Sequence, residues 1–62
     1  MELRVSIAIQ SHLSDAMIEM EFAPEMAMYR LRFVKYLVNM FPETDKKVDI
    51  DAVYEQFKLG NK

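Results

Sequence analysis

The sequence predicts a mostly α-helical protein, in which an N-terminal strand precedes an antiparallel helical hairpin and a short C-terminal helix. Three observations predict this fold class. Residues 24–41 carry apolar side chains at helical spacing and are followed by Pro42. Residues 2–9 alternate apolar and polar side chains, which is the period of a strand. The chain has 62 residues, so we expect residues 1–62 to form a single small domain.

The alternation over residues 2–9 predicts a half-buried strand. Its apolar members are Leu3, Val5, Ile7 and Ile9. A second interpretation stays open, because Val5 and Ile9 also continue the apolar row of the next helix, which would then run from about residue 3 to Phe22. A lone strand leaves its edges unpaired. The strand interpretation therefore predicts a partner strand from another copy of the chain.

The first helix of the hairpin is predicted at residues 11–22, with Ser11 as its N-cap. We expect its core-facing row to consist of Leu13, Ala16, Met17 and Met20. The connection to the next helix is short, which favours an antiparallel hairpin.

The central helix is predicted at residues 24–41. Pro24 suits the first helical position, and the helix dipole favours Glu25 beside it. Its narrow polar edge consists of Arg32, Lys35 and Asn39. The remaining arc, about 220° wide, is almost wholly apolar, whereas an ordinary surface helix has an apolar stripe of about 100°. We expect the rest of the chain to cover one side of this arc and a second copy to cover the other.

The C-terminal helix is predicted at residues 49–59. Asp49 is its expected N-cap, and Val48 can contact Val53 as a hydrophobic staple. Its apolar face consists of Ile50, Val53, Tyr54 and Phe57. Gly60 is expected to end it. A helix this short is unstable alone, so it must dock on the hairpin to be ordered.

Size and composition predict self-association. A core of this size contributes only a few kcal/mol, and small domains usually add disulfides, a metal or oligomerisation. The chain has no Cys and one His, which leaves oligomerisation, most simply a two-fold homodimer. A chain without Cys is compatible with a reducing cytoplasm. We expect a cytoplasmic protein with no membrane contact, because the sequence has neither a spanning apolar run nor a signal peptide.

The first predicted helix carries a weak candidate metal site. His12, Asp15 and Glu19 share one face, and an imidazole with two carboxylates can bind a divalent cation. The competing interpretation, which we favour, is a solvated face with acids that the helix dipole attracts. No arrangement typical of a nucleophile and its base is present, and a single glycine excludes a phosphate-binding loop. We therefore expect no enzyme activity and no cofactor.

Three side chains of the central helix are candidate interaction residues. Arg30 lies within the apolar arc, where a charge needs a partner. It either pairs with Asp15, Glu19 or an acid of another subunit, or presents its charge to a ligand. Met28 and Tyr36, beside the polar edge, are expected to form a small exposed patch.

The order strand, helix, helix, with Arg-Val-Ser-Ile at residues 4–7 in the strand, resembles the ribbon-helix-helix family of DNA-binding dimers over residues 2–41. The resemblance implies that two copies pair their strands into a ribbon that reads the major groove. It places Arg4 and Ser6 toward DNA. The C-terminal helix would then resemble the tail with which antitoxins of this family hold a toxin.

Two functional hypotheses follow. The first is a non-enzymatic, oligomeric helical module that acts through contacts with a protein partner in an accessory or regulatory role. The alternative is a ribbon-helix-helix-like transcriptional regulator or antitoxin that binds DNA. A metal or small-ligand binder that uses His12, Asp15 and Glu19 is a third, less favoured hypothesis.

Overall fold

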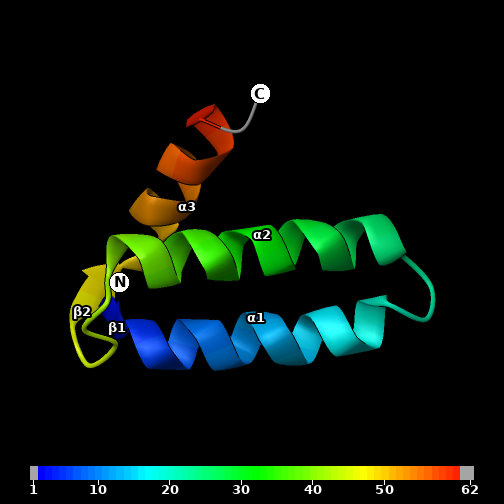
Figure 1. The fold of residues 1–62 in the computed structure, drawn as a ribbon, viewed down its shortest axis with the longest axis horizontal. Helices are drawn as coiled ribbons and strands as arrows, with labels where there is room; N and C mark the ends of the chain where they lie inside the picture. The colour runs from blue at the N-terminus through cyan, green and yellow to red at the C-terminus, as the bar shows by residue number, and fades with distance from the viewer. Residues whose placement is uncertain (1, 61–62) are drawn as a thin grey trace.

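The computed structural model describes residues 2–60, and most of them are helical, as the sequence predicts. The elements in chain order are β1 (Glu2–Arg4), α1 (Val5–Glu19), α2 (Pro24–Met40), β2 (Lys47–Asp49) and α3 (Ile50–Gly60). Figure 1 shows α1 and α2 side by side and antiparallel, with α3 beside α2. The two short strands lie at the end of the hairpin opposite the turn between α1 and α2.

The hairpin matches the prediction closely at α2, whereas α1 ends at Glu19, three residues before the predicted end at Phe22. α2 begins at Pro24, as predicted, and ends at Met40, one residue before the predicted end. The two helices pack against each other, and each has a buried alanine, Ala16 in α1 and Ala27 in α2. Among residues 2–60, no helix has both the length and the apolar character needed to cross a bilayer.

The predicted strand at residues 2–9 is wrong beyond Arg4, because residues 5–9 form the first turns of α1. The helical interpretation is correct for these residues. Val5 is 0% exposed and Ala8 is buried, while Ile7 is exposed. The alternating pattern therefore does not describe which side chains are buried. Packing of Val5 and Ala8 in the core outweighs the strand preference of β-branched residues.

The sequence analysis expected a partner strand from another copy, but β1 pairs with β2 of the same chain, so β1 has a partner without a second copy. The pairing is antiparallel and sets Leu3 opposite Val48 and Arg4 opposite Lys47. β2 lies within the segment that the sequence indicated as a polar link and the start of the last helix. Pairing with β2 covers one edge of β1 without a second copy.

The start of α1 explains why Ser11 is not an N-cap. α1 begins six residues before Ser11, and no side chain caps it. Backbone carbonyls of the loop before β2 take that role instead. The Val5 N–H donates to the Lys46 carbonyl at 3.0 Å, and the Ser6 N–H donates to the Thr44 carbonyl at 2.9 Å. These bonds satisfy two amides that the first helical turn leaves free.

α3 docks on the hairpin through aromatic side chains. It spans Ile50–Gly60, close to the predicted residues 49–59, and the Asp49 carboxylate accepts a hydrogen bond from the Ala52 N–H at 3.3 Å. This is the N-cap that the sequence predicts. The core cluster joins the three helices and β2, and it consists of Val5, Ala8, Phe33, Leu37, Val48, Ile50 and Phe57.

Candidate functional site

A polar cluster between the two hairpin helices is centred on the Arg30 guanidinium. Arg30 Nε donates to Glu19 Oε1 at 2.6 Å, and its Nη1 donates to His12 Nδ1 at 3.0 Å. Nη1 also lies 3.5 Å from Asp15 Oδ2. The three candidate metal ligands therefore come together as their spacing predicts, but a guanidinium lies among them. Of the two interpretations of Arg30, its contacts match pairing with Asp15 and Glu19.

The same contacts define the protonation state of His12. Arginine has no acceptor, so the Nδ1 of His12 must accept the hydrogen bond and the ring is neutral, with its proton on Nε2. Burial and the nearby Arg30 charge lower the pKa of His12 below its ordinary value. The hydrogen bond with Glu19 raises the pKa of Arg30, so its positive charge persists. The cluster thus holds one cation, two carboxylates and a neutral imidazole.

The contacts of the polar cluster favour a role in stabilising the fold over a role in metal binding. Glu19 is only 8% exposed, and a carboxylate buried to that extent needs a charged or hydrogen-bonding partner. Arg30 provides it. Within residues 2–60, no three His, Cys, Asp or Glu side chains are arranged to hold a metal ion. The cluster also fixes α3, because the His12 ring lies 4.9 Å from the Phe33 ring and 6.3 Å from the Tyr54 ring, between centroids.

The patch expected at Met28 and Tyr36 does not form, because the two side chains have different surroundings. Met28 is 51% exposed. Tyr36 is half-buried, with its ring centroid 5.3 Å from that of Phe57 and 6.5 Å from that of Phe33. Tyr36 therefore belongs to the contact between α2 and α3. The polar edge of α2 gave no indication of this, because α3 reaches it from a distant part of the sequence.

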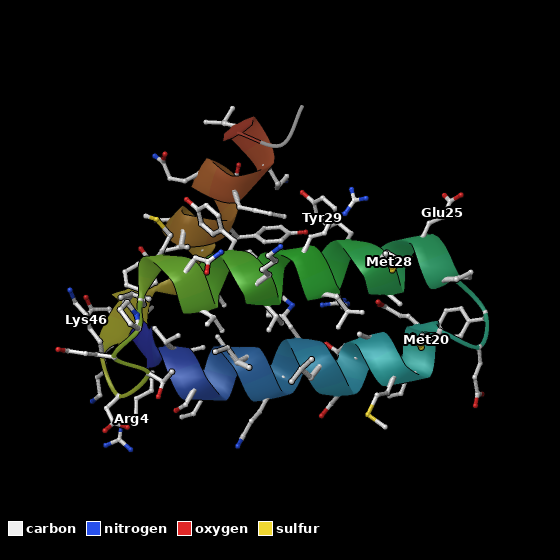
Figure 2. All side chains as sticks on the ribbon, viewed as in Figure 1. Arg4, Met20, Glu25, Met28, Tyr29 and Lys46 are labelled. Carbon is white, nitrogen blue, oxygen red and sulfur yellow. The ribbon has the colours of Figure 1, made fainter. Side chains whose placement is uncertain are left out.

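The candidate DNA-binding residues lie at the strand end of the molecule. Arg4 is exposed in β1 opposite Lys47, and Figure 2 shows Arg4 and Lys46 at the same end of the hairpin. Ser6 lies in the first turn of α1 instead of on a strand surface. Lys46 and Lys47, which sequence reasoning assigned to a polar link, are thus neighbours of Arg4.

A group of exposed apolar side chains lies on the side of the hairpin away from α3. We call it the open face, and it consists of Leu13, Met17 and Met20 of α1 with Val38 and the half-buried Leu31 of α2. Met17 is 74% exposed and Met20 is 58% exposed. The prediction that Leu13, Met17 and Met20 face the core is therefore wrong, although Ala16 is buried as predicted. The buried small residues of α1 are Ala8 and Ala16. The neighbouring row of Leu13, Met17 and Met20 is not covered by another element.

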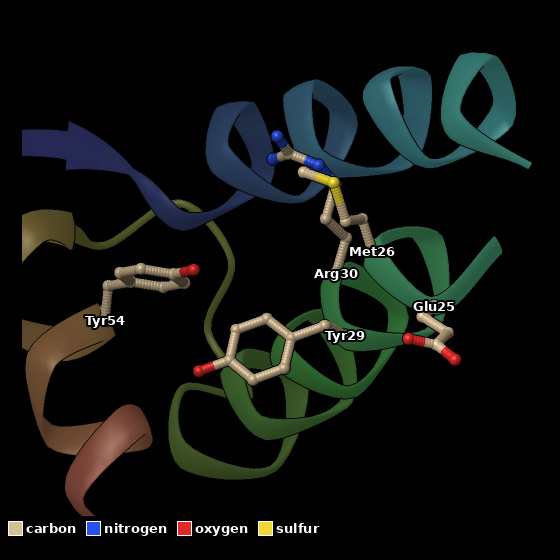
Figure 3. A pocket seen from close by; sticks show the side chains of 5 residues that line it. All are labelled: Glu25, Met26, Tyr29, Arg30 and Tyr54. Carbon is tan, nitrogen blue, oxygen red and sulfur yellow. The ribbon is translucent and has the colours of Figure 1, made fainter. Parts of the chain in front are cut away.

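A notch lies on the other side of the hairpin, between α2 and α3, and sequence reasoning did not find it. It encloses about 230 Å³ and is lined by Glu25, Met26, Tyr29, Arg30 and Tyr54 (Figure 3). The rings of Tyr29 and Tyr54 are nearly perpendicular, at 87°, with their centroids 6.1 Å apart. No local pattern could reveal this site, because Tyr54 comes from a helix distant in sequence.

Comparisons with protein-family models, with curated proteins and with solved structures found no match for this chain.

Proposed function

We propose that this protein is a non-enzymatic helical module that self-associates through its open face and acts through protein contacts, in an accessory or regulatory role. The observation that carries the proposal is the set of exposed apolar side chains on the open face, namely Leu13, Met17 and Met20 of α1 and Val38 of α2. Such patches on a soluble monomer usually mark an interaction site. A cytoplasmic location fits a chain that has no cysteine.

The position of the two rows supports a single binding surface. Around α2, at about 100° per residue, the side that α3 covers carries Tyr29 and Phe33, and the side toward α1 carries Ala27. The next row in the same direction holds Leu31 and Val38. The corresponding row of α1 lies beyond Ala16, away from His12. His12 lies beside Tyr54 of α3, so both rows lie on the side of the hairpin that faces away from α3.

A second copy is the partner that the size of the chain favours. A standard interface buries about 800 Å² of each partner, and the described residues expose 4678 Å² in total. An isologous dimer would therefore cover roughly a sixth of the surface with one contact. Each 100 Å² of apolar surface removed from water contributes about 2.5 kcal/mol before the cost of association. That gain would supplement a small core.

Sedimentation equilibrium tests the proposal. The wild-type chain is expected to reach twice its monomer mass of 7.3 kDa as concentration rises. Met17→Lys should hold the protein at monomer mass without loss of helicity, because Met17 is exposed and a lysine there must be buried only in the dimer. Ile18→Lys is the matched control, since Ile18 is also exposed and lies about 100° away on α1. A monomeric wild-type chain at high concentration would refute self-association.

DNA binding is the second candidate function, and the arrangement at the strand end favours it. The register places Lys47 opposite Arg4, and Lys46 adjoins them, so three cations gather where the sequence alone placed one. Glu2 and Asp49 oppose each other in the same ladder and offset part of this charge. A mobility-shift titration with duplex DNA at low salt tests the idea. Binding that is unchanged in Arg4→Gln would contradict it.

A further inference from the structure

The notch between α2 and α3 has the size and charge of a site for one basic side chain. We propose that it binds a lysine or arginine presented by a basic amphipathic helix of a partner protein. The inference rests on the proposed function, since it names the kind of partner that such a module would contact. It concerns a surface on the opposite side of the hairpin from the open face.

The notch exists because α3 covers only part of its side of α2. Met26 lies seven residues before Phe33, so the two share one row of the helix. α3 buries Phe33 completely but leaves Met26 54% exposed. The volume of the notch, about 230 Å³, is smaller than the roughly 300–1,000 Å³ of pockets for small molecules. It equals the liquid volume of about eight waters, which suits a single long side chain.

The walls of the notch suit the aliphatic stem and charged head of a basic residue. Tyr29 and Tyr54 provide aromatic surface, and Met26 adds a flexible thioether. Figure 3 shows the Arg30 guanidinium turned toward α1 and away from the Tyr29 ring. Glu25 lies on the opposite side of the space from Tyr54, where its carboxylate can pair with an entering cation.

The charge around the notch selects a cation over an anion. Arg30 is held by Glu19 and Asp15, and with Glu25 these three carboxylates around one guanidinium leave a net charge of −2. Lys58, near Tyr54, is itself 3.6 Å from Glu55, so this pair adds no net charge. Residues 18–29 contain no lysine or arginine. Arg32 lines a neighbouring hollow with Glu25 and Tyr29, and its charge changes the balance to −1. Asp15, Glu19 and Glu55 each form an ion pair with a cation of the chain, which leaves the Glu25 carboxylate for an entering cation.

Exposed apolar side chains at the turn end of the hairpin, where Met26 of the notch also lies, explain why the partner should be amphipathic. Phe22, in the turn, is 70% exposed, and Ile18 at the end of α1 is exposed as well. A methionine-rich apolar surface with acids beside it fits a helix that carries leucines on one face and lysines on the other. The turn end of the hairpin carries Glu21 and Glu25 next to these apolar residues.

The experiment is an NMR titration of the full chain with an amphipathic peptide of about 16 residues, leucine at helical core spacing and lysine elsewhere. Amide shifts are expected at residues 25–30 and at Tyr54, and the same peptide with glutamate for lysine should not bind. Met26→Lys places the chain's own cation in the notch and should weaken binding at least about tenfold. Met28→Lys is the matched control, because Met28 is equally exposed but lies about 160° away on α2. It should bind like the wild type.

Four results would overturn the proposal. They are absence of binding, equal binding of the lysine and glutamate peptides, unchanged affinity in Met26→Lys, and shifts that map to the open face. Self-association is tested independently of peptide binding. Its failure would appear as a monomer mass of the wild-type chain measured without peptide. Glu25→Gln gives a second variant that leaves the apolar lining intact, and it should lower affinity and reduce its dependence on salt.

Discussion

Both sides of the helical hairpin carry apolar residues, but those on one side are buried and those on the other are exposed to solvent. On the α3 side, aromatic rings of α2 and α3 pack together, and Phe33 is fully buried among His12, Tyr36, Tyr54 and Phe57. On the open face, Leu13, Met17 and Met20 remain in contact with solvent. The contrast teaches that helical periodicity indicates which residues share a face, whereas burial depends on which element covers that face.

Phe33→Ala tests this contrast with the largest expected effect. A buried phenylalanine truncated to alanine typically costs about 3–5 kcal/mol, which approaches the total stability of a small domain. We expect the variant to be largely unfolded by circular dichroism at 25 °C. Met17→Ala, on the open face, should change the free energy of unfolding of the monomer by less than about 0.5 kcal/mol. Equal losses in the two variants, measured at concentrations where the chain is monomeric, would abolish the distinction between the faces.

Arg30→Met tests whether the polar cluster stabilises the fold. It removes the partner of the buried Glu19 carboxylate, and an unsatisfied buried polar group costs about 1–3 kcal/mol. We expect a lower midpoint in urea denaturation. The double variant Arg30→Met with Glu19→Met should recover most of the loss, because it removes both members of the pair. A single variant that is as stable as the wild type would indicate that Arg30 serves binding instead.

The acid response of the α3 side is the smallest predicted effect. Because the pKa of His12 is lowered in the folded state, the unfolded chain binds a proton more readily. The contribution of His12 to stability is thus complete above the unfolded pKa of about 6.5 and is lost as the pH falls through it toward the folded pKa. His12 faces Arg30, Asp15, Glu19 and Tyr54, so its protonation would set two cations against each other beside α3.

Urea denaturation at a series of pH values measures this effect. The wild-type chain should lose stability as the pH falls from about 6.5 toward the lowered pKa of His12 in the folded state. His12→Gln should show a flatter profile in that interval, because a glutamine oxygen can accept the Arg30 hydrogen bond without titrating. Identical profiles for the two proteins would show that other groups cause the acid response.

Several features of the fold were predictable because their causes are local. Pro24 and Pro42 mark the limits of the central helix, and Asp49 caps α3 as its position indicates. The spacing of His12, Asp15 and Glu19 correctly placed them on one face. The same reasoning named Asp15 and Glu19 as partners for Arg30, since a charge in an apolar arc needs a counter-charge.

The sequence by itself determined the helical class, the hairpin and the helix boundaries near its prolines, because proline geometry and side-chain periodicity act within a few residues. The tertiary structure decided the rest. Residues 5–9 became helical because Val5 and Ala8 enter the core and because distant carbonyls satisfy the first amides of α1. The docking position of α3 determines which face of the hairpin is buried. A pattern that occurs in one segment carries no information about the distant segment that will cover it.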